Sequence, residues 1–169
     1  MTGVNGVAFD PERLLSTLQE HHAEFVVVGG FSLAAHGVVR GTKDVDIVPN
    51  PDVANIEHLA AALTALGATI DLGDIDPNEL EITVDRDGLA QGGNFRLLTI
   101  RGRLDVMQDV DGVRDYDELN EGSVEVSIPG VPQPVRFAGY ESLITMKSAA
   151  GRDQDLIDIA DLRRARGES

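Results

Sequence analysis

The sequence predicts an α+β fold, a mixed β-sheet flanked by helices, with two more helices toward the C-terminal end. Two observations support this class. Short β-branched apolar runs alternate with amphipathic stretches in the first part of the chain, which indicates strands and helices packed together. The middle and later strands follow one another without intervening helices, so the pattern is not a regular βαβ series.

The predicted helices have recognisable ends. Asp10 fits an N-cap and Pro11 the first helical position of the first helix, whose leucines share one face. A short second helix stops at Gly37, because glycine readily adopts the left-handed conformation that ends a helix. Gly151 separates the last two helices. The predicted helices are 10–22, 31–36, a stretch from 52 or 55 to 66, 140–150 and 152–166.

The predicted strands are short apolar runs bounded by turn residues. The run at 25–28 is entirely apolar and β-branched after Phe25, as in a buried strand. Gly102 joins two strands tightly. Residues 71–94 are rich in Asp, Gly, Asn and Pro and predict mainly a loop, with one further strand considered at 82–84. The predicted strands are 25–28, 44–48, 95–101, 103–108, 124–128 and 134–137.

Length and composition favour one domain over residues 1–169, with a core at about 10–138 and the C-terminal helices at about 140–166. The formal net charge of −15 makes nucleic acid an unlikely main partner, because such a surface repels a polyanion at long range. The absence of cysteine and of a signal-peptide pattern leads us to expect a cytoplasmic protein. No apolar run approaches the length of a membrane span.

The most informative segment is Val28-Gly29-Gly30-Phe31-Ser32, followed by Asp44-Val45-Asp46-Ile47. Alternate strand residues share a face, so Asp44 and Asp46 point the same way while their apolar neighbours enter the core. Two adjacent carboxylates suit a hard divalent cation such as Mg²⁺. Gly29 and Gly30, at a strand-to-helix junction, offer bare backbone N–H groups to a phosphate. The combination predicts chemistry on a nucleoside triphosphate.

A two-metal site commonly needs a third carboxylate, and Asp105 is the favoured candidate. It lies in a predicted strand between apolar neighbours, where an unpaired carboxylate is costly. A strand-end residue satisfied by arginine or a backbone N–H is the alternative for Asp105. Four turn-like competitors rank lower: Asp85, Asp87, Asp109 and Asp111.

Several other side chains are candidates for nucleotide contact. The Ser32 hydroxyl is placed either on a phosphate or as an N-cap. Arg40 either clamps a phosphate or pairs with an acid. Lys147, near the break between the last helices, is placed within reach of a triphosphate, with Arg152 close to it. The acidic stripe of Asp155, Asp158 and Asp161 is interpreted as a solvated helix face or as partners of Arg152 and Arg163.

The spacing of the diglycine and the aspartates resembles the signature of the nucleotidyltransferase superfamily that includes DNA polymerase beta. Thirteen residues separate Gly30 from Asp44. The stretch from Arg40 to Asp46 is similar to the Arg-x-Thr-x-Asp-x-Asp form found in small bacterial nucleotidyltransferase-like proteins, some of which act as toxins or antitoxins. The resemblance implies a nucleotidyltransferase-like sheet and transfer of a nucleoside monophosphate from an NTP, with release of pyrophosphate.

The resemblance also implies roles for individual residues. Asp44 and Asp46 would carry Mg²⁺, and Asp105 would complete the site and help to activate the acceptor hydroxyl. Gly29, Gly30 and Ser32 would hold the triphosphate. Superfamily members of known substrate usually add an acceptor-binding domain, and little chain remains here for one. The acceptor would then bind at a homodimer interface, a partner protein would supply it, or the activity would be lost.

Three functions follow from these features. The first is an Mg²⁺-dependent nucleotidyltransferase acting on a hydroxyl of a small molecule or protein. The second is a non-catalytic regulator or antitoxin-like partner that keeps the fold. The third is an aminoglycoside-type resistance enzyme, because an acidic cleft suits a cationic antibiotic. The sequence selects neither the NTP nor the acceptor.

Overall fold

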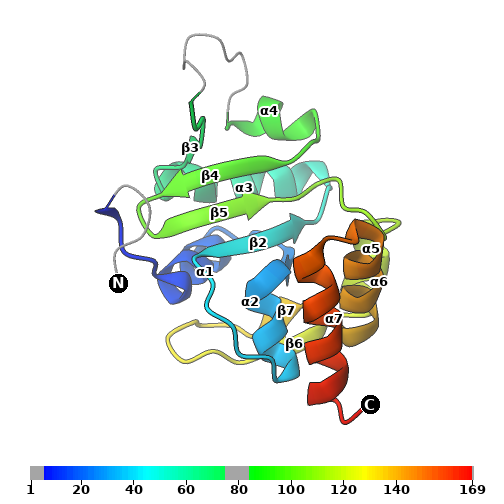
Figure 1. The fold of residues 1–169 in the computed structure, drawn as a ribbon. Coiled ribbons are helices and arrows are strands. Elements are labelled where there is room, and N and C mark those ends of the chain that lie inside the picture. The colour runs from blue at the N-terminus through cyan, green and yellow to red at the C-terminus, as the bar shows by residue number, and fades with distance from the viewer. Residues whose placement is uncertain (1–5, 75–83, 169) are drawn as a thin grey trace.

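A computed structural model of the chain describes residues 6–74 and 84–168. Seven strands form one mixed sheet in the order β3-β4-β5-β2-β1-β7-β6, with helices on both faces, which confirms the predicted fold class (Figure 1). The strands are β1 (Phe25–Val28), β2 (Asp44–Pro49), β3 (Thr69–Ile70), β4 (Phe95–Thr99), β5 (Gly102–Val106), β6 (Val124–Val126) and β7 (Val135–Phe137).

Most helices lie where the sequence predicts them. They are α1 (Pro11–Glu20), α2 (Gly29–Leu33) with the 3₁₀ turn η2 (Ala34–His36), α3 (Val53–Ala65), α4 (Arg86–Ala90), α5 (Tyr116–Glu121), α6 (Tyr140–Ala150) and α7 (Asp153–Ala165). At α1 the Asp10 side chain accepts a hydrogen bond from the Arg13 N–H, as expected of an N-cap. Gly151 is left-handed and ends α6.

The central strands set the geometry of the sheet. β2 runs antiparallel to β1 and parallel to β5, and β1 runs parallel to β7. The hairpin between β4 and β5 is antiparallel and turns just before Gly102, whose φ of +108° suits glycine. Parallel pairing of β2 with β5 brings the same ends of both strands together. Asp46 is therefore level with Asp105 across the ladder.

The sheet separates two apolar cores. Val27 of β1 joins a core with α1 and α3, which includes Leu14 and Leu59. Val26 and Val28 face the opposite way and join a core with α2, α6 and α7, represented by Leu33, Met146 and Leu162 in a single buried cluster. All four β1 residues are buried because helices cover both of its faces (Figure 1).

Two short helices and one short strand fall where the sequence analysis predicted none. α4 and α5 follow Asp85 and Asp115, whose side chains accept hydrogen bonds from the N–H groups of Gly88 and Glu118. Such capping allows a helix of five or six residues that has too few turns for an apolar period. The strand considered at 82–84 falls largely outside the described residues. No helix in residues 6–74 and 84–168 combines the length and apolar character needed to cross a membrane.

Candidate active site

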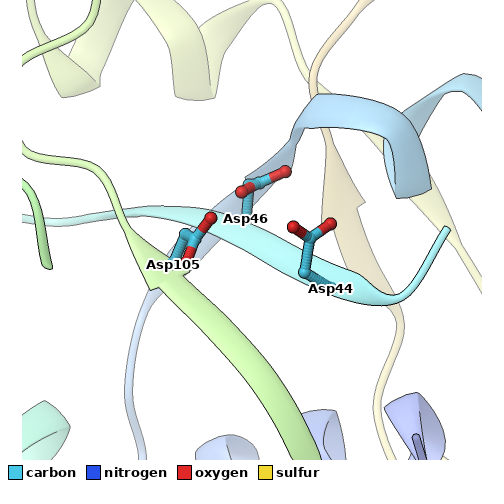
Figure 2. Close-up of side chains that lie close together, drawn as sticks. All are labelled: Asp44, Asp46 and Asp105. Atoms are coloured by element: carbon cyan, nitrogen blue, oxygen red, sulfur yellow. The ribbon is translucent and has the colours of Figure 1, made fainter. Parts of the chain in front are cut away.

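Three carboxylates meet on one face of the sheet. Asp44 and Asp46 alternate along β2 with the fully buried Val45 and Ile47, and Asp105 projects from the neighbouring β5. Each of the three offers an oxygen, and these oxygens all lie within 4.8 Å of one another. Figure 2 shows the three side chains gathered above the two adjacent strands. The alternation that buries the valine and isoleucine thus exposes the aspartates to a shared space.

Glycine is required where β1 turns into α2 beside this triad. Gly29 has a φ of +71°, and a Cβ built there would lie 1.9 Å from Oδ2 of Asp46. A Cβ on Gly30 would lie 2.9 Å from Nη2 of Arg40. Gly29 therefore lets the backbone approach the triad in a way that a side chain would prevent, and Gly30 leaves room for the Arg40 guanidinium.

Burial and mutual repulsion disturb the titration of the triad. Burial is the main cause that raises the pKa of Asp46 to about 8, with the Asp44 charge and the hydrogen bond to Asp105 adding to it. Burial also raises the pKa of Asp105, although the hydrogen bond from Asp46 and the charges of Arg96 and Arg103 oppose the rise. Without a cation, a proton is retained between Asp46 and Asp105 near neutral pH.

The donor set fits a hard divalent cation. All candidate ligands are carboxylate oxygens, the type that Mg²⁺ and similar ions prefer. Oδ1 of Asp105 is buried, and no hydrogen-bond partner for it exists among the described residues. A buried acceptor without a donor is costly, and a cation would satisfy it while removing the repulsion within the triad. These observations favour a divalent metal without selecting which one.

A second charged cluster lies beside the glycines. Asp158 of α7 is almost completely buried and accepts hydrogen bonds from Arg40, from Lys147 at 2.8 Å, and from Gln154. Burial raises the pKa of Asp158, but these hydrogen bonds outweigh it and hold the pKa below the ordinary value. Arg40 and Lys147, both predicted nucleotide contacts, are thereby held together by one carboxylate.

The acidic stripe on α7 is not a solvated face, so that part of its interpretation is wrong. Asp155 and Asp158 are only 3% and 1% exposed. The predicted pairing with Arg152 is confirmed, because its guanidinium and backbone N–H both donate to Asp155. Asp161 pairs with Arg164 rather than with Arg163. Period-three spacing does not tell which side of the helix faces the protein, and here partner cations satisfy the buried acids.

The structure also shows the contacts of Ser32 and of the aspartates that competed with Asp105. Ser32 is fully buried and donates its hydroxyl hydrogen to the Gly29 carbonyl oxygen. The N-cap of α2 is Val28 rather than Ser32, and the contact of Ser32 with a phosphate stays a prediction. Asp85 caps α4, and Asp87 lies beside Arg86. Within the described ranges, the one group of metal-ligating side chains is the triad, which includes none of the four competing aspartates.

Sequence reasoning missed Asp155, Asp158 and Arg96 as neighbours of the site. Arg96 lies on β4 directly across the ladder from Asp105. The hairpin at Gly102 predicts that β4 and β5 pair, but the register that places this arginine opposite the aspartate comes only from the structure.

A family model described as "Nucleotidyl transferase AbiEii toxin, Type IV TA system" matches residues 13–163. No curated protein matches the chain significantly.

Three solved structures share the fold. A lincosamide antibiotic adenylyltransferase, LnuA, with bound lincomycin is 15% identical, covers 94% of this chain and 99% of its own, and has a TM-score of 0.61. ANT(2'')-Ia in complex with adenylyl-2''-tobramycin is 17% identical over 92% of this chain and 87% of its own, with a TM-score of 0.58. A proposed nucleotidyltransferase from Thermotoga maritima is 17% identical over 98% and 99% of the two chains, with a TM-score of 0.51. The match covers 87% to 99% of each of these three chains.

Proposed function

Because the chain belongs to the AbiEii nucleotidyltransferase toxin family, we propose that it transfers a nucleoside monophosphate from an NTP to a hydroxyl group, with Mg²⁺ as the metal. The acceptor is a small molecule or a protein. The observation that carries the proposal is the carboxylate triad of Asp44, Asp46 and Asp105, opened to a common space beside a diglycine turn. An isolated acidic pair on a strand would not need a glycine at a position where a Cβ would lie 1.9 Å from one of its oxygens.

The triad would hold the metal through oxygens of all three aspartates. When bound there, Mg²⁺ would polarise the α-phosphate and compensate charge that develops on the leaving pyrophosphate. Asp105 is the proposed base for the acceptor hydroxyl. It lies at the edge of the triad on β5, on the side away from the diglycine turn.

The triphosphate would lie on the other side of Asp46. The backbone of Gly29 and Gly30 can approach phosphate oxygens closely, and the Arg40 guanidinium stands beside Gly30. Lys147 adds a point charge from α6. Ser32 supports this turn by donating a hydrogen bond to the Gly29 carbonyl oxygen. Asp158 keeps both cations in place.

We extend the proposal to the whole chain as one functional unit. The relatives of known ligand, LnuA and ANT(2'')-Ia, consist largely of the shared fold, which supports acceptor binding without an added domain. The family description names a toxin of a type IV toxin–antitoxin system, so we propose that an antitoxin counteracts the activity. A homodimer interface that binds the acceptor stays a prediction from the sequence.

The test is label transfer from each α-labelled NTP, with Mg²⁺ and host lysate. We expect transfer by the wild type, loss in Asp44→Ala, and wild-type transfer by Asp87→Ala, an exposed aspartate outside the triad. Expression of the wild type or of Asp87→Ala should inhibit growth of the host cells, and expression of Asp44→Ala should not. Transfer that survives Asp44→Ala would refute the site. Binding of Mg²⁺ and NTP without any transfer would favour the non-catalytic regulator.

A further inference from the structure

The two substrates of a nucleotidyl transfer must approach the triad from opposite sides. In phosphoryl transfer the attacking and leaving oxygens lie roughly in line. The diglycine turn, Arg40 and Lys147 all lie on the β1 side of β2, where they would hold the leaving pyrophosphate. The attacking hydroxyl therefore enters from the β5 side, over β5 and β4, next to Asp105.

Among the described residues, no helix covers that half of the sheet face (Figure 1). The face that carries the triad is covered by α2, α6 and α7 over β2, β1 and β7, whereas no labelled helix lies over β4 and β5 on that face (Figure 1). The burial pattern agrees, because the alternate residues Phe95 and Leu97 are buried in the core with α1 and α3 while Arg96 is exposed. The triad thus stands at the border between a covered and an uncovered surface.

Arg96 projects from this open surface beside the triad. It is directly opposite Asp105 in the antiparallel ladder, and directly opposite residues project from the same face with their Cβ atoms about 5 Å apart. An arginine at this position would contact the part of the acceptor that lies next to its attacking hydroxyl.

Arg96 also has no ion-pair partner among the described residues. Ten of the fourteen lysines and arginines lie within ion-pair distance of an acid, as expected in a chain of net charge −15. Within residues 6–74 and 84–168, four have no such partner: Arg13, Lys43, Arg96 and Arg163. Of these four, Arg96 is the one that stands opposite a triad carboxylate in the sheet register.

We propose that Arg96 is a specificity-determining residue that binds a phosphate of the acceptor, so that the acceptor is a phosphorylated hydroxyl compound. This inference rests on the proposed function and narrows its acceptor class. A guanidinium pairs bidentately with phosphate. It would repel a polycationic acceptor, which disfavours the aminoglycoside alternative despite the fold shared with ANT(2'')-Ia. The acceptor class narrows to phosphorylated small metabolites, because a chain of net charge −15 repels a polynucleotide at long range.

The first test identifies the labelled product. Wild type, Arg96→Ala, Arg96→Lys and the control Arg13→Ala are incubated with α-labelled NTP, Mg²⁺ and separate small-molecule, RNA and protein fractions of the host. We expect label in a phosphorylated compound of the small-molecule fraction, and label confined to the RNA or protein fraction would contradict that acceptor class. Arg96→Ala should raise the acceptor KM at least about tenfold, as for loss of a charged hydrogen bond, with kcat and the NTP KM retained. Arg96→Lys should recover part of the loss, and Arg13→Ala should behave as wild type.

Label in a neutral or cationic acceptor, or an acceptor KM unchanged in Arg96→Ala, would overturn the inference while leaving nucleotidyl transfer intact. A second measurement needs no turnover. Inorganic phosphate is titrated into protein loaded with Mg²⁺ and a non-hydrolysable NTP, and the arginine Nε–H signals are followed by NMR. A saturable shift at Arg96 that Arg13 does not show supports the inference. Equal or absent shifts overturn it, and failure to load with Mg²⁺ and NTP overturns the proposed function as well.

Discussion

Metal binding to the triad should release a proton, and its affinity should therefore rise steeply with pH. The metal-free pKa of Asp46 is about 8, raised by burial and by the neighbouring Asp44 and Asp105. A cation needs the carboxylate, so below that pKa it must displace the proton. About 1% of Asp46 is ionised at pH 6 and about 90% at pH 9, so the apparent affinity for Mg²⁺ should rise roughly a hundredfold between them.

The raised pKa of Asp46 also predicts how the stability of the metal-free protein depends on pH. The pKa of Asp46 in the folded protein exceeds its ordinary value of 3.8, so the folded state binds the proton more tightly than the unfolded state. The contribution of Asp46 to stability is complete below about pH 4 and declines as pH rises through about 8. Asp46→Asn, which imitates the protonated form, should therefore melt above the wild type at pH 9 without metal and lose the stabilisation by Mg²⁺.

Isothermal titration calorimetry of Mg²⁺ at pH 6, 7, 8 and 9, in two buffers of different ionisation enthalpy, measures affinity and proton release together. We expect nearly one proton released at pH 6 and almost none at pH 9. Differential scanning calorimetry of both proteins supplies the stability comparison. A Mg²⁺ affinity independent of pH with no proton release would refute the reasoning, as would an Asp46→Asn variant that melts below the wild type at pH 9 without metal.

The other predictions concern the supports of the site. Gly29→Ala should abolish transfer and lower the free energy of unfolding by about 1–3 kcal/mol, because it combines a positive φ with a Cβ 1.9 Å from Asp46 Oδ2. Gly92→Ala shares the positive φ but has no atom within 4 Å, so urea denaturation of both separates strain from the clash, and equal losses would contradict the close approach. Asp158→Asn should cost about 3–5 kcal/mol and weaken NTP binding, because it removes the buried negative charge that faces Lys147 at 2.8 Å and Arg40; unchanged denaturation and NTP calorimetry would contradict this.

The sequence predicts the core of the site because local rules determine it. Strand alternation places Asp44 and Asp46 on one face, and the diglycine marks the one position where the backbone must pass close to them. Asp105 is recognisable because an acid between apolar strand residues is unusual. Each of these signals lies within a few residues of the side chain concerned.

What the sequence does not predict depends on contacts between distant segments. The buried Asp158 resembles a solvated acid until α7 is known to pack with Lys147 inward and Arg40 arrives from a loop 118 residues away. Arg96 looks like an ordinary exposed strand residue, and only the register with Asp105 gives it a role. α4 and α5 escape prediction because capping by single aspartates determines them rather than periodicity.

The most direct test of the central claim compares ATP labelled at the α-phosphate with ATP labelled at the γ-phosphate, and likewise for the other NTPs, in parallel reactions with host lysate. Nucleotidyl transfer predicts α-label in the acceptor and γ-label in released pyrophosphate, both lost in Asp44→Ala. Transfer of γ-label to the acceptor would contradict the account, because the triad would then serve phosphoryl rather than nucleotidyl transfer.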